Sequence, residues 1–298
     1  MEWLTEPFQL AFQQRALVGG VLAAVALAVV GTWVVIRGMT FLGDALVHGV
    51  VPGIALAIIF DFNVMLGAVL AAAVMIGGIN LVHRQTSFSE DTGIGLLFVG
   101  MLGLGVILIS STDSYTGNLT SILFGNALGV TAGDLAILAG VAVLVLAVSA
   151  ILYRHFLVLS FNEQKAKLLG LNPQLAHIAL LSLITLSIVG SFQTVGTLLV
   201  FGLLVGPPAT AALLVKRVPT MMITAAIIGV VSVFVGLAVS YYADTSGSAT
   251  MAVIPIVLFF AVLTFRSLRR APNTPAVDRA DQGSQVSPGS SATTSAEV

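Results

Sequence analysis

The sequence contains no cysteine, and only 8% of its 298 residues carry a charged side chain. The absence of cysteine excludes disulfide bonds, thiolate metal ligands and thiol catalysis. A soluble domain carries about 25% charged residues, so this chain lacks the polar surface that it would need in water. Its formal net charge of −1 argues against nucleic acid as a partner. The phosphate-binding pattern GxxxxGK followed by Ser or Thr is also absent, so the chain has no such loop for hydrolysing ATP.

Hydrophobic residues, by contrast, make up 57% of the chain and gather in long runs. A helix crosses a bilayer with about 20 apolar residues, and these runs are too long and too apolar for barrel strands. We therefore predict an all-α membrane bundle of about nine transmembrane helices, some of them broken. They are expected at residues 17–36, 39–60, 62–82, 92–111, 134–154, 174–195, 197–215, 219–243 and 249–267. The division of 174–215 into two helices is the weakest, so eight spans remain possible.

The basic residues predict the orientation, because cytoplasmic loops are enriched in Lys and Arg. If the N-terminus is external, every basic segment except Arg15 lies on the cytoplasmic side. These segments are Arg37, His83–Arg84, Arg154 to Lys167, Lys216–Arg217 and Arg266–Arg270. Nine spans then place the C-terminus inside as well. We expect residues 1–270 to form the transmembrane domain. Residues 271–298 are rich in Pro, Ser, Thr, Ala and Gly, which predicts a disordered cytoplasmic tail.

Asp44 and His48 are ionisable groups in the second apolar run, where such groups are costly and often functional. A helix that starts at Met39 is long enough to span, and it places His48 about 14 Å along, near the bilayer midplane. The two residues stand at i and i+4, so their side chains meet on one helix face. A carboxylate oxygen and an imidazole nitrogen so placed can bind one divalent cation. There are two alternatives. The pair could relay a proton, or it could only lock helix packing.

Pro52 and Gly53 follow this pair directly. A proline inside a helix cannot donate to the carbonyl four residues earlier, which here belongs to His48. We therefore expect the helix to kink just beyond the pair and to leave a free carbonyl beside the two side chains. Transporters build binding sites at broken helices of this kind.

A second candidate break lies in GTLLVFGLLVGPP at Gly196–Pro208. Pro207 and Pro208 would free the carbonyls of Leu203 and Leu204, which predicts a hinged helix facing the bundle interior. Three nearby side chains could add oxygens to a pathway, namely Gln193, Thr194 and Thr197. Helix packing through small residues is the alternative interpretation.

The stretch SFNEQKAKLLGLNP at Ser160–Pro173 predicts a short amphipathic helix on the cytoplasmic side. Asn162 is a suitable N-cap, and Glu163 favours the first turn and pairs with Lys167 at i+4. Gly170 suits the position just after the helix end. Such a helix either lies in the membrane interface or docks a soluble partner, and its capping chemistry fits both.

The string VVIRGMTFLGDALVHGVVPGIALA at Val34–Ala57 resembles the signature of the permease subunits of bacterial ABC importers for manganese, zinc and iron. Four later strings are similar to that family's pattern in the same order: SILFGNALGV, FNEQKAKLLGL, VGTLLVFGLLVGPPATAALL and LAVSYYADTSGSAT. The resemblance covers roughly residues 15–268. It implies that Asp44 and His48 coordinate the metal and that the stretch before Gly170 docks in the ATPase subunit. The chain departs from the pattern at three positions that are not proposed ligands, Gly38, Val47 and Asn162.

The resemblance also implies that the chain is a multi-pass transport subunit of the bacterial plasma membrane rather than an enzyme. It would work as a homodimer with cytoplasmic ATPase subunits, which hydrolyse the ATP, and with an extracytoplasmic metal-binding protein. The cargo would be a zinc, manganese or iron ion, with no permanently bound cofactor. Two alternatives remain. A permease for a metal chelate such as a siderophore or cobalamin would not need Asp44 and His48, and a proton-coupled carrier would need no ATPase.

Overall fold

The computed structural model describes residues 6–85, 90–111, 130–161 and 172–269. These residues form helices and no strand. A short 3-10 helix, η1 (Glu6–Gln9), precedes α2 (Ala11–Ile36), α3 (Thr40–Gly49), α4 (Val51–Ile59), α5 (Val64–Gln85), α6 (Glu90–Ser110), α8 (Ala132–Ile151), α9 (Tyr153–Phe161), α11 (Pro173–Val195), α12 (Thr197–Leu214), α13 (Val218–Ala243) and α14 (Gly247–Arg269).

Every apolar run identified in the sequence lies on one of these helices. Within the described residues, eight candidate spans are long and apolar enough to cross a bilayer, and α3 and α4 together make up one of them, Thr40–Ile59. The remaining run lies on α12, whose apolar stretch Leu199–Leu214 is shorter. The predicted all-α membrane bundle of about nine helices, with eight as the smaller count, is therefore confirmed.

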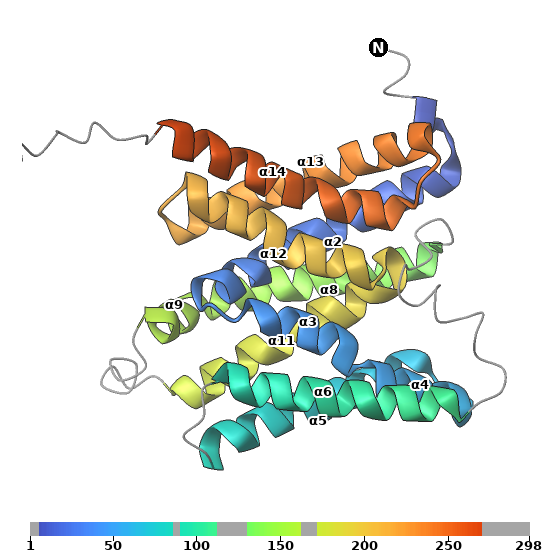
Figure 1. Cartoon of the computed structure of the whole chain (residues 1–298), viewed down its shortest axis with the longest axis vertical. Coiled ribbons are helices and arrows are strands. Elements are labelled where there is room, and N and C mark those ends of the chain that lie inside the picture. The colour runs from blue at the N-terminus through green and yellow to red at the C-terminus, as the bar shows by residue number, and fades with distance from the viewer. Residues whose placement is uncertain (1–5, 86–89, 112–129, 162–171, 270–298) are drawn as a thin grey trace, which may run out of the picture.

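The helices lie side by side across the view of Figure 1, and successive spans run in alternating directions. The described chain begins at η1 on the right and ends with α14 on the left, as expected for an odd number of crossings. The left end gathers the last turns of α2 and α14, the whole of α9, and the turn between α12 and α13. These segments carry the basic residues Arg37, Arg154, Lys216, Arg217, Arg266 and Arg269. That this end faces the cytoplasm stays a prediction.

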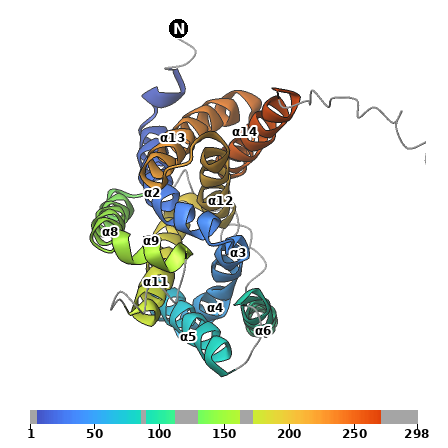
Figure 2. The ribbon, with the colours of Figure 1, turned by 90° about the vertical axis from the view of Figure 1, so that its left-hand side faces the viewer.

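Two groups of helices make up the bundle, as Figure 2 shows along the helix direction. In one group α2, α12, α13 and α14 pack against one another, and in the other α3, α4, α5 and α6 do so. α11 connects the groups because it packs against α2 and α12 on one side and α3 and α5 on the other. The site region belongs to the second group.

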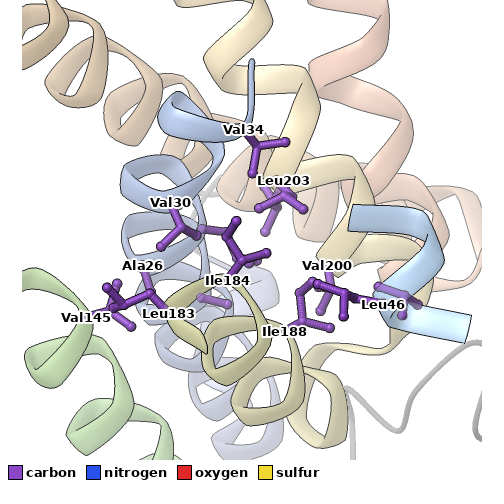
Figure 3. Close-up of a cluster of buried hydrophobic side chains, with 14 of the residues drawn as sticks. Ala26, Val30, Val34, Leu46, Val145, Leu183, Ile184, Ile188, Val200 and Leu203 are labelled. Atoms are coloured by element: carbon purple, nitrogen blue, oxygen red, sulfur yellow. The ribbon is translucent and has the colours of Figure 1, made fainter. Parts of the chain in front are cut away.

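The main core runs through both groups, and it is filled by apolar side chains from α2, α3, α5, α6, α8, α9, α11, α12, α13 and α14. Figure 3 shows the side chains from α2, α3, α8, α11 and α12 that point toward one another, with Ala26, Val30, Val34, Leu46, Val145, Leu183, Ile184, Ile188, Val200 and Leu203 labelled. Leu42 and Leu46 of α3 are fully buried there. This contact fixes one face of α3 and leaves the other face for the residues discussed below.

Gly196 separates α11 from α12, which settles the weakest division in the sequence as two helices. Its backbone has φ 81° and ψ 160°, a conformation that is essentially restricted to glycine. The predicted coupling helix with Asn162, Glu163, Lys167 and Gly170 lies outside the described residues, as does the predicted tail at 271–298.

Candidate functional site

Asp44 and His48 lie one turn apart on α3, on the face opposite to Leu42 and Leu46. The Nε2 atom of His48 is 3.5 Å from Oδ1 of Asp44. The two side chains are 30% and 33% exposed, in contrast to the fully buried leucines. The helical spacing therefore places both ligand atoms together on the side of α3 that the rest of this chain leaves partly open.

The distance between the two ligand atoms suits a shared cation better than a direct hydrogen bond. Protein hydrogen bonds from nitrogen to oxygen are usually about 2.7–3.2 Å long, so 3.5 Å is too long for a good one. If a cation lay about 2.1 Å from both atoms, their 3.5 Å separation would give a ligand–cation–ligand angle of about 113°, which is close to tetrahedral. The pair can thus hold a cation with little movement of either side chain.

The helix divides at Val50, between the pair and Pro52. Val50 ends α3 and begins α4 with φ −82° and ψ −14°, and Pro52 lies in the first turn of α4. Pro52 has no N–H for the carbonyl of His48, and the backbone donor that faces this carbonyl is the N–H of Val50, only two residues on. The break expected from Pro52 is thus present beside the site.

Gly53 has a packing role at this break, because it meets α5 where the two helices cross. A Cβ added at Gly53 would collide with the carbonyl oxygen of Gly67 and would lie 2.6 Å from Cβ of Ala71. A Cβ at Gly67 would in turn collide with the carbonyl oxygen of Gly53. The two glycines therefore let the backbones of α4 and α5 touch, as small residues do between membrane helices.

Phe98 of α6 contacts two aromatic rings of α3 at the site, those of His48 and Phe41. Its ring centroid lies 6.0 Å from that of His48 and 5.5 Å from that of Phe41, in edge-to-face geometry in both cases. Sequence reasoning missed Phe98 because a single aromatic residue in a long apolar run carries no signal by itself.

Pro207 and Pro208 lie elsewhere in the bundle, buried on the continuous helix α12. The carbonyl of Leu204, which Pro208 cannot engage, lies against Gly31 of α2 so closely that a Cβ at Gly31 would overlap it. This geometry fits the packing interpretation. Leu204 also approaches the site helix, since a Cβ at Gly43 of α3 would overlap its Cδ2. Gln193, Thr194 and Thr197 belong to the junction of α11 and α12 around Gly196.

The comparison with known proteins decides the family. The pattern of the ABC 3 transport family matches residues 9–266. The chain belongs to the ABC 3 transport family. The family resemblance drawn from the sequence motifs is thereby confirmed, and the chain is a multi-pass protein of the bacterial inner membrane.

Relatives within the ABC 3 family are alike over nearly their whole length. The manganese transport system membrane protein MntC of Listeria innocua is 37% identical over 265 residues, which are 89% of this chain and 94% of that protein. A probable iron transport system membrane protein of Haemophilus influenzae is 31% identical over 268 residues, 90% of this chain and 98% of that protein. The solved structure of PsaBC from Streptococcus pneumoniae in complex with Fab has a TM-score of 0.78 and 29% identity, and covers 90% of this chain and 99% of that chain.

The side chains of this ABC 3 family chain that could contact a metal ion at the candidate site are few. Among the described residues, no group of three or more His, Asp or Glu side chains is arranged to hold a metal ion. Asp44 and His48 therefore offer two protein ligands, and the other coordination positions would be open to water or to other groups. Few ligands suit an ion in transit, because a tightly enclosed ion would not be released.

Proposed function

We propose that this chain is the membrane permease of an ATP-driven importer of divalent metal ions, in which Asp44 and His48 bind the ion on its way. The observation that carries the proposal is the placement of their ligand atoms, 3.5 Å apart on the partly open face of a broken apolar helix. Ionisable groups inside membrane spans are expensive and mark ion pathways. Membership of a transport family whose relatives are named for manganese and iron supports the same function.

Manganese is the cargo that the relatives favour. The relative from Listeria innocua is named for manganese, and so is the import permease ScaB of Streptococcus gordonii at 36% identity. One carboxylate and one imidazole, without any thiolate, form a hard to borderline ligand set that accepts Mn²⁺ and Fe²⁺ and also Zn²⁺. We therefore place manganese first and iron second.

The transporter contains further subunits in this proposal. The sequence has no GxxxxGK-type loop, so ATP is hydrolysed on a partner, which docks at the segment around Glu163–Lys167. A second copy of the chain faces the side of α3 where Phe41, Asp44 and His48 are only partly covered by their own chain. An extracytoplasmic metal-binding protein delivers the ion.

Reconstitution of the complete transporter tests this function. The chain is assembled in proteoliposomes with the proposed ATPase and metal-binding protein, and uptake of radiolabelled manganese is followed. We expect uptake that requires ATP and that unlabelled iron inhibits. Uptake by this chain alone would instead establish a self-sufficient carrier, and uptake only of a metal chelate would establish a chelate permease.

A further inference from the structure

Phe98 on α6 adds an aromatic ring to the site that Asp44 and His48 form on α3. The planes of the Phe98 and His48 rings meet at 62°, with their centroids 6.0 Å apart. This is an edge-to-face arrangement, which aromatic pairs prefer at centroid distances of about 4.5–7 Å. α6 comes from a different part of the sequence, and Figure 1 shows it beside the α3–α4 segment.

The imidazole of His48 needs such a neighbour, because Asp44 alone does not fix the plane of the ring. The separation of 3.5 Å between Nε2 and Oδ1 is beyond good hydrogen-bond range. Rotation about the bond between Cβ and the imidazole is broad, without sharp staggered wells. An imidazole held by Asp44 alone can therefore turn its Nε2 atom away from the carboxylate.

The surroundings of Phe98 hold its own ring in place. On one side it meets the ring of Phe41 at 76° and 5.5 Å between centroids. Gly95, one turn earlier on α6, lies beside Phe41, since a Cβ there would be in ordinary van der Waals contact with that ring, 3.9 Å away. Leu97, which precedes Phe98, faces α5 instead, and a Cβ at Gly78 would lie 2.9 Å from it. α6 is thus fastened to α5 through Leu97 while Phe98 faces the site.

We infer that Phe98 is a positioning residue for metal binding. Its ring holds the imidazole of His48 with Nε2 toward Asp44, so that both ligand atoms are in place before the cation arrives. Groups that are ordered beforehand bind more tightly, because less freedom is lost on binding. The inference rests on the proposed function, since it assigns Phe98 a role within the proposed metal site.

Cobalt(II) provides the test, because its visible absorption reports the geometry of its ligands. It is titrated into the full-length chain assembled with its ATPase in nanodiscs. Phe98→Leu keeps an apolar side chain but loses the ring edge. We expect it to weaken cobalt binding about three- to tenfold, or about 0.7–1.4 kcal/mol, and to alter the absorption spectrum. Phe98→Tyr retains the ring and should restore both affinity and spectrum.

Two controls separate positioning from a general loss of packing. Leu96→Ala removes apolar volume from the same helix at an exposed position on the side away from His48, and should leave cobalt affinity unchanged. In a His48→Gln background, Phe98→Leu should cause no further loss, because its effect passes through the imidazole. Phe98→Met serves as a second ringless variant if Phe98→Leu does not assemble.

Unchanged cobalt affinity in the ringless variant, or an equal loss in Leu96→Ala, would overturn the inference. Manganese uptake by the wild-type complex is measured in parallel. If the wild type transports manganese and the ringless variant binds cobalt normally, the role of Phe98 alone is refuted. A wild-type complex that takes up no metal refutes the proposed function, and the inference with it.

Discussion

Gly53 and Gly67 face each other where α4 crosses α5, so closely that a Cβ on either residue would overlap the other's carbonyl oxygen. This crossing lies directly after the helix break at Val50. The contact between these glycines fixes the start of α4 relative to α3. It thereby fixes the end of the α3 face that carries Asp44 and His48.

A methyl group at this crossing should force the helices apart. We expect Gly53→Ala to destabilise the protein by about 1–3 kcal/mol, the usual cost of overpacking a close contact. Thermal unfolding in detergent measures the loss, and manganese uptake should fall with it because α4 is displaced. Gly77→Ala on α5 is the matched control, since a Cβ at Gly77 meets nothing within 4 Å. Equal stability of the two variants would show that the crossing is not tight.

Gly196 should tolerate substitution as poorly as Gly53 does, because its backbone conformation is strained for a residue with a side chain. At φ 81° and ψ 160° a residue with a Cβ is strained by about 1–3 kcal/mol, so Gly196→Ala should lower the unfolding temperature. Gly140→Ala in the middle of α8 provides the comparison, because that helical position is open. If both variants unfold at the same temperature, the junction between α11 and α12 is not constrained as described.

Local rules predicted the spans and the proximity of Asp44 to His48. A chain in lipid must satisfy its backbone hydrogen bonds within each helix, so the apolar runs alone locate the helices. The pairing of Asp44 with His48 follows from i,i+4 spacing, and the break near Val50 follows from Pro52, both of which act within a few residues.

Contacts between helices that are distant in sequence could not be predicted in this way. Phe98 reaches His48 only because α6 packs beside α3. The kink expected beside Pro52 and Gly53 gave no sign that Gly53 would meet Gly67 of α5 in a tight crossing. The motif at Pro207 and Pro208 likewise gave no sign that the carbonyl of Leu204 would lie against Gly31 of α2. In each case the contact depends on packing between helices rather than on local sequence.

The proposed coupling segment can be tested by replacement. Exchanging Glu163–Leu169 for a Gly/Ser linker of equal length removes the helix that we expect to dock the ATPase. The chain should still insert in the membrane, but the ATPase should no longer co-purify with it. Deletion of residues 271–298 is the control and should leave the complex intact, because that tail has little to bury. Co-purification with the linker variant would refute the coupling role.

Substitution of the two proposed ligands tests the site most directly. Asp44→Asn and His48→Gln keep the approximate size of each side chain while weakening or removing a metal ligand. Each should reduce manganese uptake at least about tenfold, because a pair of ligands that loses one member holds the ion much more weakly. Expression and assembly with the ATPase should persist, since both side chains are partly exposed and lie on the face of α3 opposite to the core. Asp61→Asn, which changes an exposed aspartate at the turn before α5, should transport normally. Normal uptake in both ligand variants would mean that the ion passes without contacting this pair.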